Sequence, residues 1–274
     1  MDFHERLHQS IHDHDSLVCV GLDVDKEKMP GFLFETSKQP YREFCHQIID
    51  ATKDVACAYK LNSAFYEAIG SEGFSIMKDV VSFIPKNTIV IVDGKRNDIG
   101  NTAKKYATAF FEGLGADAVT VNPYLGWDGI EPFLSYSDRC SFILCRTSNP
   151  SASDFQDLVT ESGLQLFLCV ADKIKQWAET GCCGAVVGAT YPEELRCIRE
   201  VLGDHIPFLI PGVGKQGGDV EKTVRFGTNS QGDQAVINSS RGIIYAGTDD
   251  DYAAHAGKAA TTLQDQINIY RKKK

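Results

Sequence analysis

The chain has 274 residues, of which 43% are hydrophobic, and a formal net charge of -9 at pH 7. This length allows one large or two ordinary domains, and single α/β barrels commonly run to about 250 residues. The acidic balance argues against nucleic acid and against an anionic membrane as general partners, because both require a positive surface. An anionic small substrate would need a local basic pocket.

Nine cysteines are scattered along the chain, mostly inside apolar runs, without a CxxC pair or a regular framework. This usage is typical of reduced core thiols in a cytosolic protein. The N-terminal segment MDFHERLHQSIHDHD is polar, and no apolar run approaches the roughly 18 residues of a membrane span. We therefore expect a cytoplasmic protein without a membrane anchor.

Short apolar runs alternate with amphipathic segments along the whole chain. Strands are predicted over residues 17–22, 56–61, 88–92, 117–121, 141–145, 185–187, 207–210 and 234–237. Helices are predicted over 40–54, 71–84, 101–112, 128–136, 164–179, 192–202 and 252–271.

This alternation calls for a parallel sheet, and eight strand units that close on themselves make a barrel. A doubly wound open sheet is the alternative, but no G-x-G-x-x-G follows the first strand. We predict a single (β/α)8 TIM barrel domain over residues 1–274.

Three charged residues follow the strand predicted at 88–92, namely Asp93, Lys95 and Asp98. Side chains alternate along a strand, so Asp93 and Lys95 should share one pocket while Gly94 points away from it. Asp98 could fold back on that pocket or reach a neighbouring subunit. A lysine between carboxylates keeps its proton strongly, which makes it a proton donor. The alternative is a surface ion-pair cluster.

In a barrel of this kind, functional residues lie after the strands. Polar residues at those positions are Asp23, Lys60, Asp93, Lys95, Ser148, Gln216 and Arg241. After the seventh strand, the glycine-rich run from Pro211 to Gly218 allows backbone amides to approach an anion, and Arg241 after the eighth can grip a phosphate through two hydrogen bonds. We predict a phosphate site built from these two loops.

His4, His8 and His12 recur every four residues and would lie on one face of an N-terminal helix. Such spacing can hold a metal ion, but neither Cys nor Glu completes a convincing ligand set. We interpret the histidines as a solvated helix face and predict no metal site and no cofactor.

The sequence resembles the orotidine 5'-monophosphate decarboxylase family over nearly its whole length. The resemblance rests on D-x-K-x-x-D-I-x-x-T at 93–102, GLD at 21–23, Lys60, TSNP at 147–150 and PGVGKQGGD at 211–219. The RTSNP and NSSRG loops resemble the longer bacterial subgroup. Gly94 stands where many relatives carry a larger residue, so we expect altered packing and intact chemistry.

The resemblance implies cofactor-free conversion of orotidine 5'-monophosphate to UMP. Its catalytic network would comprise Lys60, Asp93, Lys95 and Asp98, with Lys95 as proton donor to the pyrimidine carbon. Ser148 and Gln216 would contact the pyrimidine, Asp23 and Lys60 the ribose, and Gly218 and Arg241 the phosphate. The remaining implied substrate contacts are Asn62, Ile99, Thr102, Pro211 and Gly217.

In this family the residues matching Asp98, Ile99 and Thr102 come from the second subunit, so the resemblance implies a homodimer with a shared site. Two other functions fit parts of the pattern. Related phosphate-binding barrels use D-x-K-x-x-D on sugar phosphates together with a metal ion. A catalytically silent nucleotide-binding protein is the second alternative, although neither Lys95 nor an acid of the motif is missing.

Overall fold

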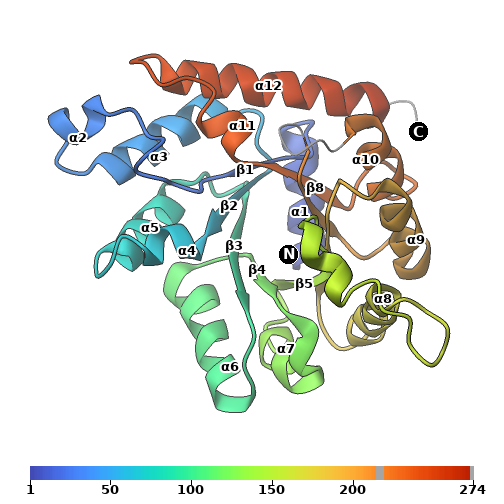
Figure 1. The fold of residues 1–274 in the computed structure, drawn as a ribbon. Helices are drawn as coiled ribbons and strands as arrows, with labels where there is room; N and C mark the ends of the chain where they lie inside the picture. Colours follow the sequence, from blue (N-terminus) through green and yellow to red (C-terminus); the bar gives the residue numbers. More distant parts are fainter. Residues whose placement is uncertain (214–218, 272–274) are drawn as a thin grey trace.

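The computed structural model describes residues 1–213 and 219–271. Eight parallel strands form a closed barrel in chain order, and β8 returns to pair with β1. The helices surround the strands (Figure 1). The strands are β1 Val18–Gly21, β2 Ala58–Asn62, β3 Ile89–Arg96, β4 Ala118–Val121, β5 Cys140–Arg146, β6 Cys183–Val187, β7 Phe208–Pro211 and β8 Ala235–Ser239. The predicted (β/α)8 barrel is confirmed.

The principal helices are α1 Phe3–Asp13, α3 Pro40–Thr52, α5 Gly73–Phe83, α6 Gly100–Ala107, α7 Trp127–Leu134, α8 Leu166–Trp177, α9 Pro192–Leu202, α10 Val220–Gly227 and α12 Tyr252–Arg271. Proline occupies the first turn of α3 and α9, where its missing N–H costs nothing. Shorter helices are α2 Phe32–Thr36, α4 Ser63–Glu67, α11 Arg241–Ile244, the π-helix η1 Thr108–Leu114, and the 3-10 helices η2 Pro123–Leu125 and η3 Pro150–Asp154.

Two differences from the sequence prediction bear on the site. β3 continues to Arg96, because its pairing with β4 resumes at Arg96 after a bulge that follows Val92. The helix predicted at 101–112 is instead α6 followed by a π-helix, whose wider turn buries Phe110, Phe111 and Leu114. The short helices α2, α4, α10 and α11 were also not predicted.

Helix α1 closes the N-terminal end of the barrel. It buries Phe3, Leu7 and Ile11 on its inner face. Its polar side chains reach segments that precede strands: Arg6 pairs with Asp117 before β4, and Ser10 donates to the Cys57 carbonyl before β2 at 2.7 Å. The opposite, C-terminal end of the barrel is therefore the open one.

The length and polarity of the helices bear on membrane association. Within residues 1–213 and 219–271, no helix is both long and apolar enough to cross a membrane.

Candidate active site

A cavity of about 360 Å³ opens at the carboxyl ends of the strands. This size is within the range of small-molecule sites, and this end of a barrel is where such enzymes place their chemistry. Its lining includes these residues predicted from the sequence: Asp23, Lys60, Asn62, Asp93, Lys95, Pro211 and Arg241.

Four of the lining residues form a row of alternating charge. Lys60 Nζ lies 3.5 Å from Asp23 Oδ1 and 3.0 Å from Asp93 Oδ2. Lys95 Nζ lies 2.7 Å from the other oxygen of Asp93. Asp93 thus holds both lysines, one on each carboxylate oxygen, and the Lys95 ammonium faces the open side of the cavity, where its side chain is 47% exposed.

The ends of β3 and β4 fix the direction of Lys95. Thr120 donates its hydroxyl to Asp93 Oδ1 at 2.7 Å and accepts the backbone N–H of Lys95 at 2.9 Å. Lys95 has a backbone φ of +44°, a left-handed conformation that is costly for a residue with a Cβ and clusters at functional sites. Gly94 faces outward, where an added Cβ would lie 2.8 Å from the Phe110 ring. The predicted alternation of Asp93 and Lys95 about Gly94 is confirmed.

The ionisation of this row follows from its geometry. Burial lowers the pKa of Lys60, but the charges of Asp23 and Asp93 outweigh burial and leave the pKa raised above its ordinary value. Burial raises the pKa of Asp93, yet Lys60 and Lys95 together hold the pKa well below the usual carboxyl range. Lys60 and Asp93 are therefore both charged at neutral pH.

Asp23 is held from the β8 side of the cavity. Ser240 donates to Asp23 Oδ2 at 2.7 Å, and the Tyr245 hydroxyl donates to the Asp23 carbonyl at 2.9 Å. Gly21 permits this approach, because a Cβ there would lie 1.8 Å from Ser240 Oγ. Among the described residues no hydrogen-bond donor reaches Asp23 Oδ1, whose nearest charged neighbour is Lys60. This oxygen is buried beside the Lys60 ammonium.

The predicted phosphate end lies between β7 and β8. Pro211 ends β7, Arg241 begins α11, and both line the cavity together with Gly212, Val213 and Gly242. Gln216, Gly217 and Gly218 lie outside the described residues.

Four predicted site residues do not line this cavity. Asp98 accepts the Ile99 N–H at 2.8 Å and lies beside α7, where a Cβ on Gly129 would be 3.2 Å from its carbonyl oxygen. Ile99 is 54% exposed, and Thr102 lies on the first turn of α6 with its side chain exposed. Ser148 follows β5 and packs against Gly188.

Other cavity residues were missed in the sequence. Thr120, Ser240 and Tyr245 position the charged row, and Asp25, Lys28 and Asn238 also line the cavity. Thr120 lies inside an apolar strand and Tyr245 in a loop, so neither position stands out by spacing. The one usable signal was Ser240, which lies beside Arg241 after the eighth strand.

A closed (β/α)8 barrel with an ionised cavity at the strand ends is the arrangement of TIM-barrel enzymes. Residues 16–256 match the Orotidine 5'-phosphate decarboxylase / HUMPS family. The chain belongs to this family.

Individual relatives agree with that assignment over the full chain. It is 48% identical to the orotidine 5'-phosphate decarboxylase of Dehalococcoides mccartyi (strain ATCC BAA-2266 / KCTC 15142 / 195), with 100% of both chains covered. It is 44% identical to that of Ralstonia pickettii (strain 12J), with 99% of this chain and 100% of the relative covered. The structure of Leishmania donovani OMP decarboxylase superposes with a TM-score of 0.85 at 34% identity and covers 99% of each chain.

Proposed function

We propose that this protein decarboxylates orotidine 5'-monophosphate to UMP and carbon dioxide in pyrimidine biosynthesis. The observation that carries the proposal is the alternating row of Asp23, Lys60, Asp93 and Lys95 at the strand ends of a barrel of this family. A row with a lysine at its open end suits a reaction that develops negative charge and then needs a proton.

The substrate would lie across the cavity with its phosphate between the β7 and β8 loops. Arg241, with Gly217 and Gly218, would hold the phosphate. Asp23 would receive a ribose hydroxyl, which is supported by its place in the cavity lining, where its side chain is 16% exposed. With the phosphate and ribose bound in this way, the pyrimidine ring would lie beside Lys95 at the end of the row.

Around the sugar and ring, Lys60 and Asn62 would contact the ribose side, Pro211 would pack beside the ligand, and Ser148 and Gln216 would read the pyrimidine. The phosphate contacts are remote from the reacting carbon. Their binding energy can still organise the site for chemistry, because remote contacts lower the barrier when they are coupled to correct positioning.

In the proposed reaction the bond between C6 and the carboxylate carbon breaks, and the electron pair stays on C6. Carbon dioxide leaves, and Lys95 transfers a proton to C6, which gives UMP. Before the transfer, the Lys95 ammonium stabilises the developing carbanion in a site poor in water. The 2.7 Å pair with Asp93 and the Thr120 hydrogen bond support this role, because they fix the Lys95 side chain and backbone so that the ammonium faces the cavity.

Asp93 has a second role in the proposal. Its carboxylate would lie near the substrate carboxylate, and repulsion between two like charges raises the energy of the bound substrate. This repulsion is relieved when carbon dioxide leaves. The low pKa of Asp93, set by Lys60 and Lys95 against its burial, supports the role because the charge persists at neutral pH.

The proposed chemistry is cofactor-free, since a fixed ammonium takes the part that an electron sink plays in other decarboxylases.

We also propose a homodimer in which Asp98, Ile99 and Thr102 complete the partner's site. Ile99 is exposed, as is Tyr124, which is 78% exposed in the turn before α7, and such side chains could take part in the contact. A cytoplasmic location is supported by nine free cysteines.

The test is the loss of orotidine 5'-monophosphate absorbance with purified protein, with and without EDTA. We expect rapid loss that EDTA does not change. Loss that EDTA abolishes would replace the cofactor-free mechanism by a metal-dependent one. UMP binding in a thermal-shift assay without any turnover would make the protein a nucleotide binder.

A further inference from the structure

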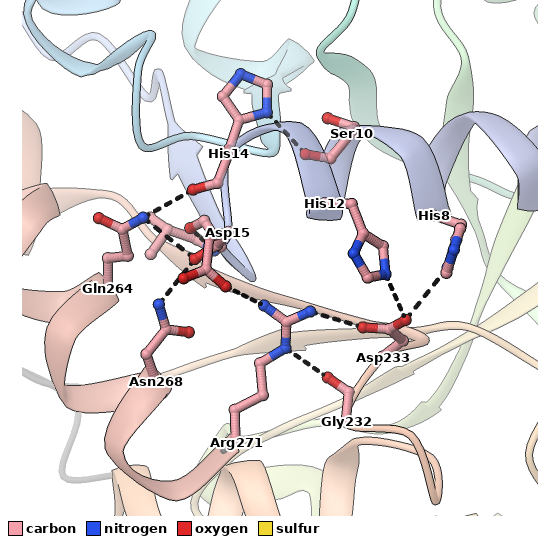
Figure 2. Close-up of polar contacts among 12 residues, drawn as sticks. His8, Ser10, His12, His14, Asp15, Gly232, Asp233, Gln264, Asn268 and Arg271 are labelled. Atoms are coloured by element: carbon pink, nitrogen blue, oxygen red, sulfur yellow. Dashed lines mark hydrogen bonds and ion pairs between the residues drawn. The ribbon is translucent and has the colours of Figure 1, made fainter.

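A second cluster of ionisable side chains lies at the N-terminal end of the barrel, opposite the active site. His8 and His12 are one turn apart on α1, and both point to Asp233, which precedes β8 (Figure 2). His8 Nδ1 lies 3.2 Å from Asp233 Oδ2, and His12 Nε2 lies 3.3 Å from the same oxygen. The two imidazole rings are 4.2 Å apart between centroids.

These separations match the edges of a metal coordination shell. Zn–N and Zn–O bonds of about 2.0–2.2 Å at tetrahedral angles place neighbouring ligand atoms about 3.4 Å apart. A charge-assisted hydrogen bond to a carboxylate is shorter, about 2.7–2.9 Å. The three donor atoms all lie within 4.8 Å of one another. The three donor atoms therefore form a candidate three-ligand face for a metal ion.

The carboxylate is held in place before any ion arrives. Asp233 is 4% exposed, and Arg271 at the end of α12 donates to its other oxygen, Oδ1, at 2.8 Å. Arg271 is itself fixed by the Gly232 carbonyl at 2.9 Å and by Asp15 Oδ1 at 3.4 Å (Figure 2). Asp233 thus turns Oδ2 toward the histidines, with Arg271 in the position of an outer partner that orients a metal ligand.

We propose that His8, His12 and Asp233 bind a divalent transition-metal ion of the zinc class. Two imidazoles with one carboxylate suit Zn²⁺ or Co²⁺, whereas Mg²⁺ and Ca²⁺ require a shell of oxygen ligands. The histidine side chains are 53% and 54% exposed, so the ion enters from solvent, and water takes the remaining coordination position.

The expected consequence is structural. The ion joins α1 to the segment before β8 and, through Arg271, to the end of α12. These elements are far apart in sequence, and binding to the folded form alone raises stability by mass action. Because the site lies at the barrel end opposite the charged cavity, orotidine 5'-monophosphate turnover should not depend on it.

The test uses untagged, chelator-treated full-length protein and Zn²⁺ as the probe. Isothermal titration should give one tight Zn²⁺ site per chain, and Tm should rise by about 5–10 °C when free Zn²⁺ exceeds its Kd about 100-fold. Co²⁺ at the same site should give the intense visible absorption of a tetrahedral ion. Loss of an outer partner of a metal ligand weakens metal binding by about 10- to 100-fold. His8→Gln and His12→Gln each remove a direct ligand, so each should weaken Zn²⁺ binding by more than this.

Two controls separate this site from other donors. His46→Gln removes an imidazole that pairs with Asp79 at 2.9 Å, and Cys182→Ser removes a thiol 3.4 Å from His4. Both variants should bind Zn²⁺ as the wild type does. Circular dichroism of the metal-free His8→Gln and His12→Gln variants establishes that they fold. Equal Zn²⁺ affinity in wild type and in a folded His8→Gln/His12→Gln double variant would overturn the proposal, as would loss of the site in Cys182→Ser alone.

Discussion

At the scale of single residues, Lys95 combines two unusual properties. Its backbone is left-handed, and its ammonium is paired to a buried carboxylate while remaining open to the cavity. The first costs on the order of 1–3 kcal/mol, which the fold can sustain because Thr120 accepts the Lys95 N–H. A backbone conformation that costs this much free energy is suited to direct one functional group, the Lys95 ammonium, into the cavity.

Lys95→Ala should lower the turnover of orotidine 5'-monophosphate by about 10⁴-fold or more, because it removes both the fixed charge and the proton donor. Single-turnover kinetics would measure the loss. UMP affinity of the same variant, measured by titration, should remain, since the proposed phosphate contact, Arg241, is a different residue of the cavity lining. Near-normal turnover would remove Lys95 from the mechanism.

Asp93→Asn should reduce the free energy of unfolding by about 3 kcal/mol at neutral pH, because Lys60 then stays buried beside Asp23 alone. Lys60 and Lys95 overcome burial and depress the pKa of Asp93 in the folded protein. Its contribution to stability is therefore present above the ordinary carboxyl pKa of about 4 and is lost as the pH falls toward the lower folded value.

Urea unfolding of both proteins measures this dependence. The difference between wild type and Asp93→Asn should be constant from about pH 5 to pH 8 and should shrink below about pH 4. Asp50→Asn, which removes the partner of Lys53 on the surface, is the matched control and should have little effect. A difference that persists unchanged in acid would contradict the assigned ionisation.

At the scale of elements, the close packing of β3 on η1 decides what position 94 can hold. Gly94→Ala places a methyl group 2.8–2.9 Å from two Phe110 ring carbons, so the ring must shift and stability should fall by about 1–3 kcal/mol. Thermal unfolding would measure the loss. Gly31→Ala, where nothing lies within 4 Å of the added Cβ, is the control.

The double variant Gly94→Ala/Phe110→Leu should recover part of that stability, because the smaller side chain leaves room for the methyl. Turnover should survive in all of these variants, since the Gly94 Cβ would point away from the cavity. A Gly94→Ala protein as stable as the wild type would mean that Phe110 moves without cost.

At the scale of the whole molecule, the proposed homodimer predicts that two differently inactivated subunits can together form one active site. Lys95→Ala and Asp98→Asn should each be inactive alone, but refolding them as an equal mixture should restore about a quarter of wild-type turnover. Half of the dimers are then mixed, and each mixed dimer has one intact site if the site is shared.

A mixture of Lys95→Ala with Lys60→Ala is the control for subunit exchange. Lys60 and Lys95 both contact Asp93 of one chain, so no mixed dimer of this pair regains a site. Mass spectrometry would show whether mixed dimers have formed. If they have formed and turnover does not increase, Asp98 acts in the site of its own chain. The single domain over residues 1–274 stays a prediction alongside the dimer.

The sequence by itself determined the eightfold alternation, the order of the strands and the charged residues at their ends. Hydrophobic periodicity is a local signal, and strict strand-helix alternation leaves few topologies to choose from. The sequence also placed α12, whose observed bounds, Tyr252–Arg271, match the predicted range. The sequence did not predict the extension of β3 to Arg96, because this extension depends on pairing with β4 beyond a bulge.

Only the tertiary structure decided which side chains meet. Thr120, Ser240 and Tyr245 reach the charged row because closure of the barrel brings β4 and the segment after β8 to the strand ends. The sequence by itself indicated a solvated helix face for the histidines of α1 and did not identify Asp233 as their acidic partner. Asp233 lies 221 residues from His12 along the chain. Spacing along a chain reveals partners within one element, whereas partners on different elements are set by how those elements pack.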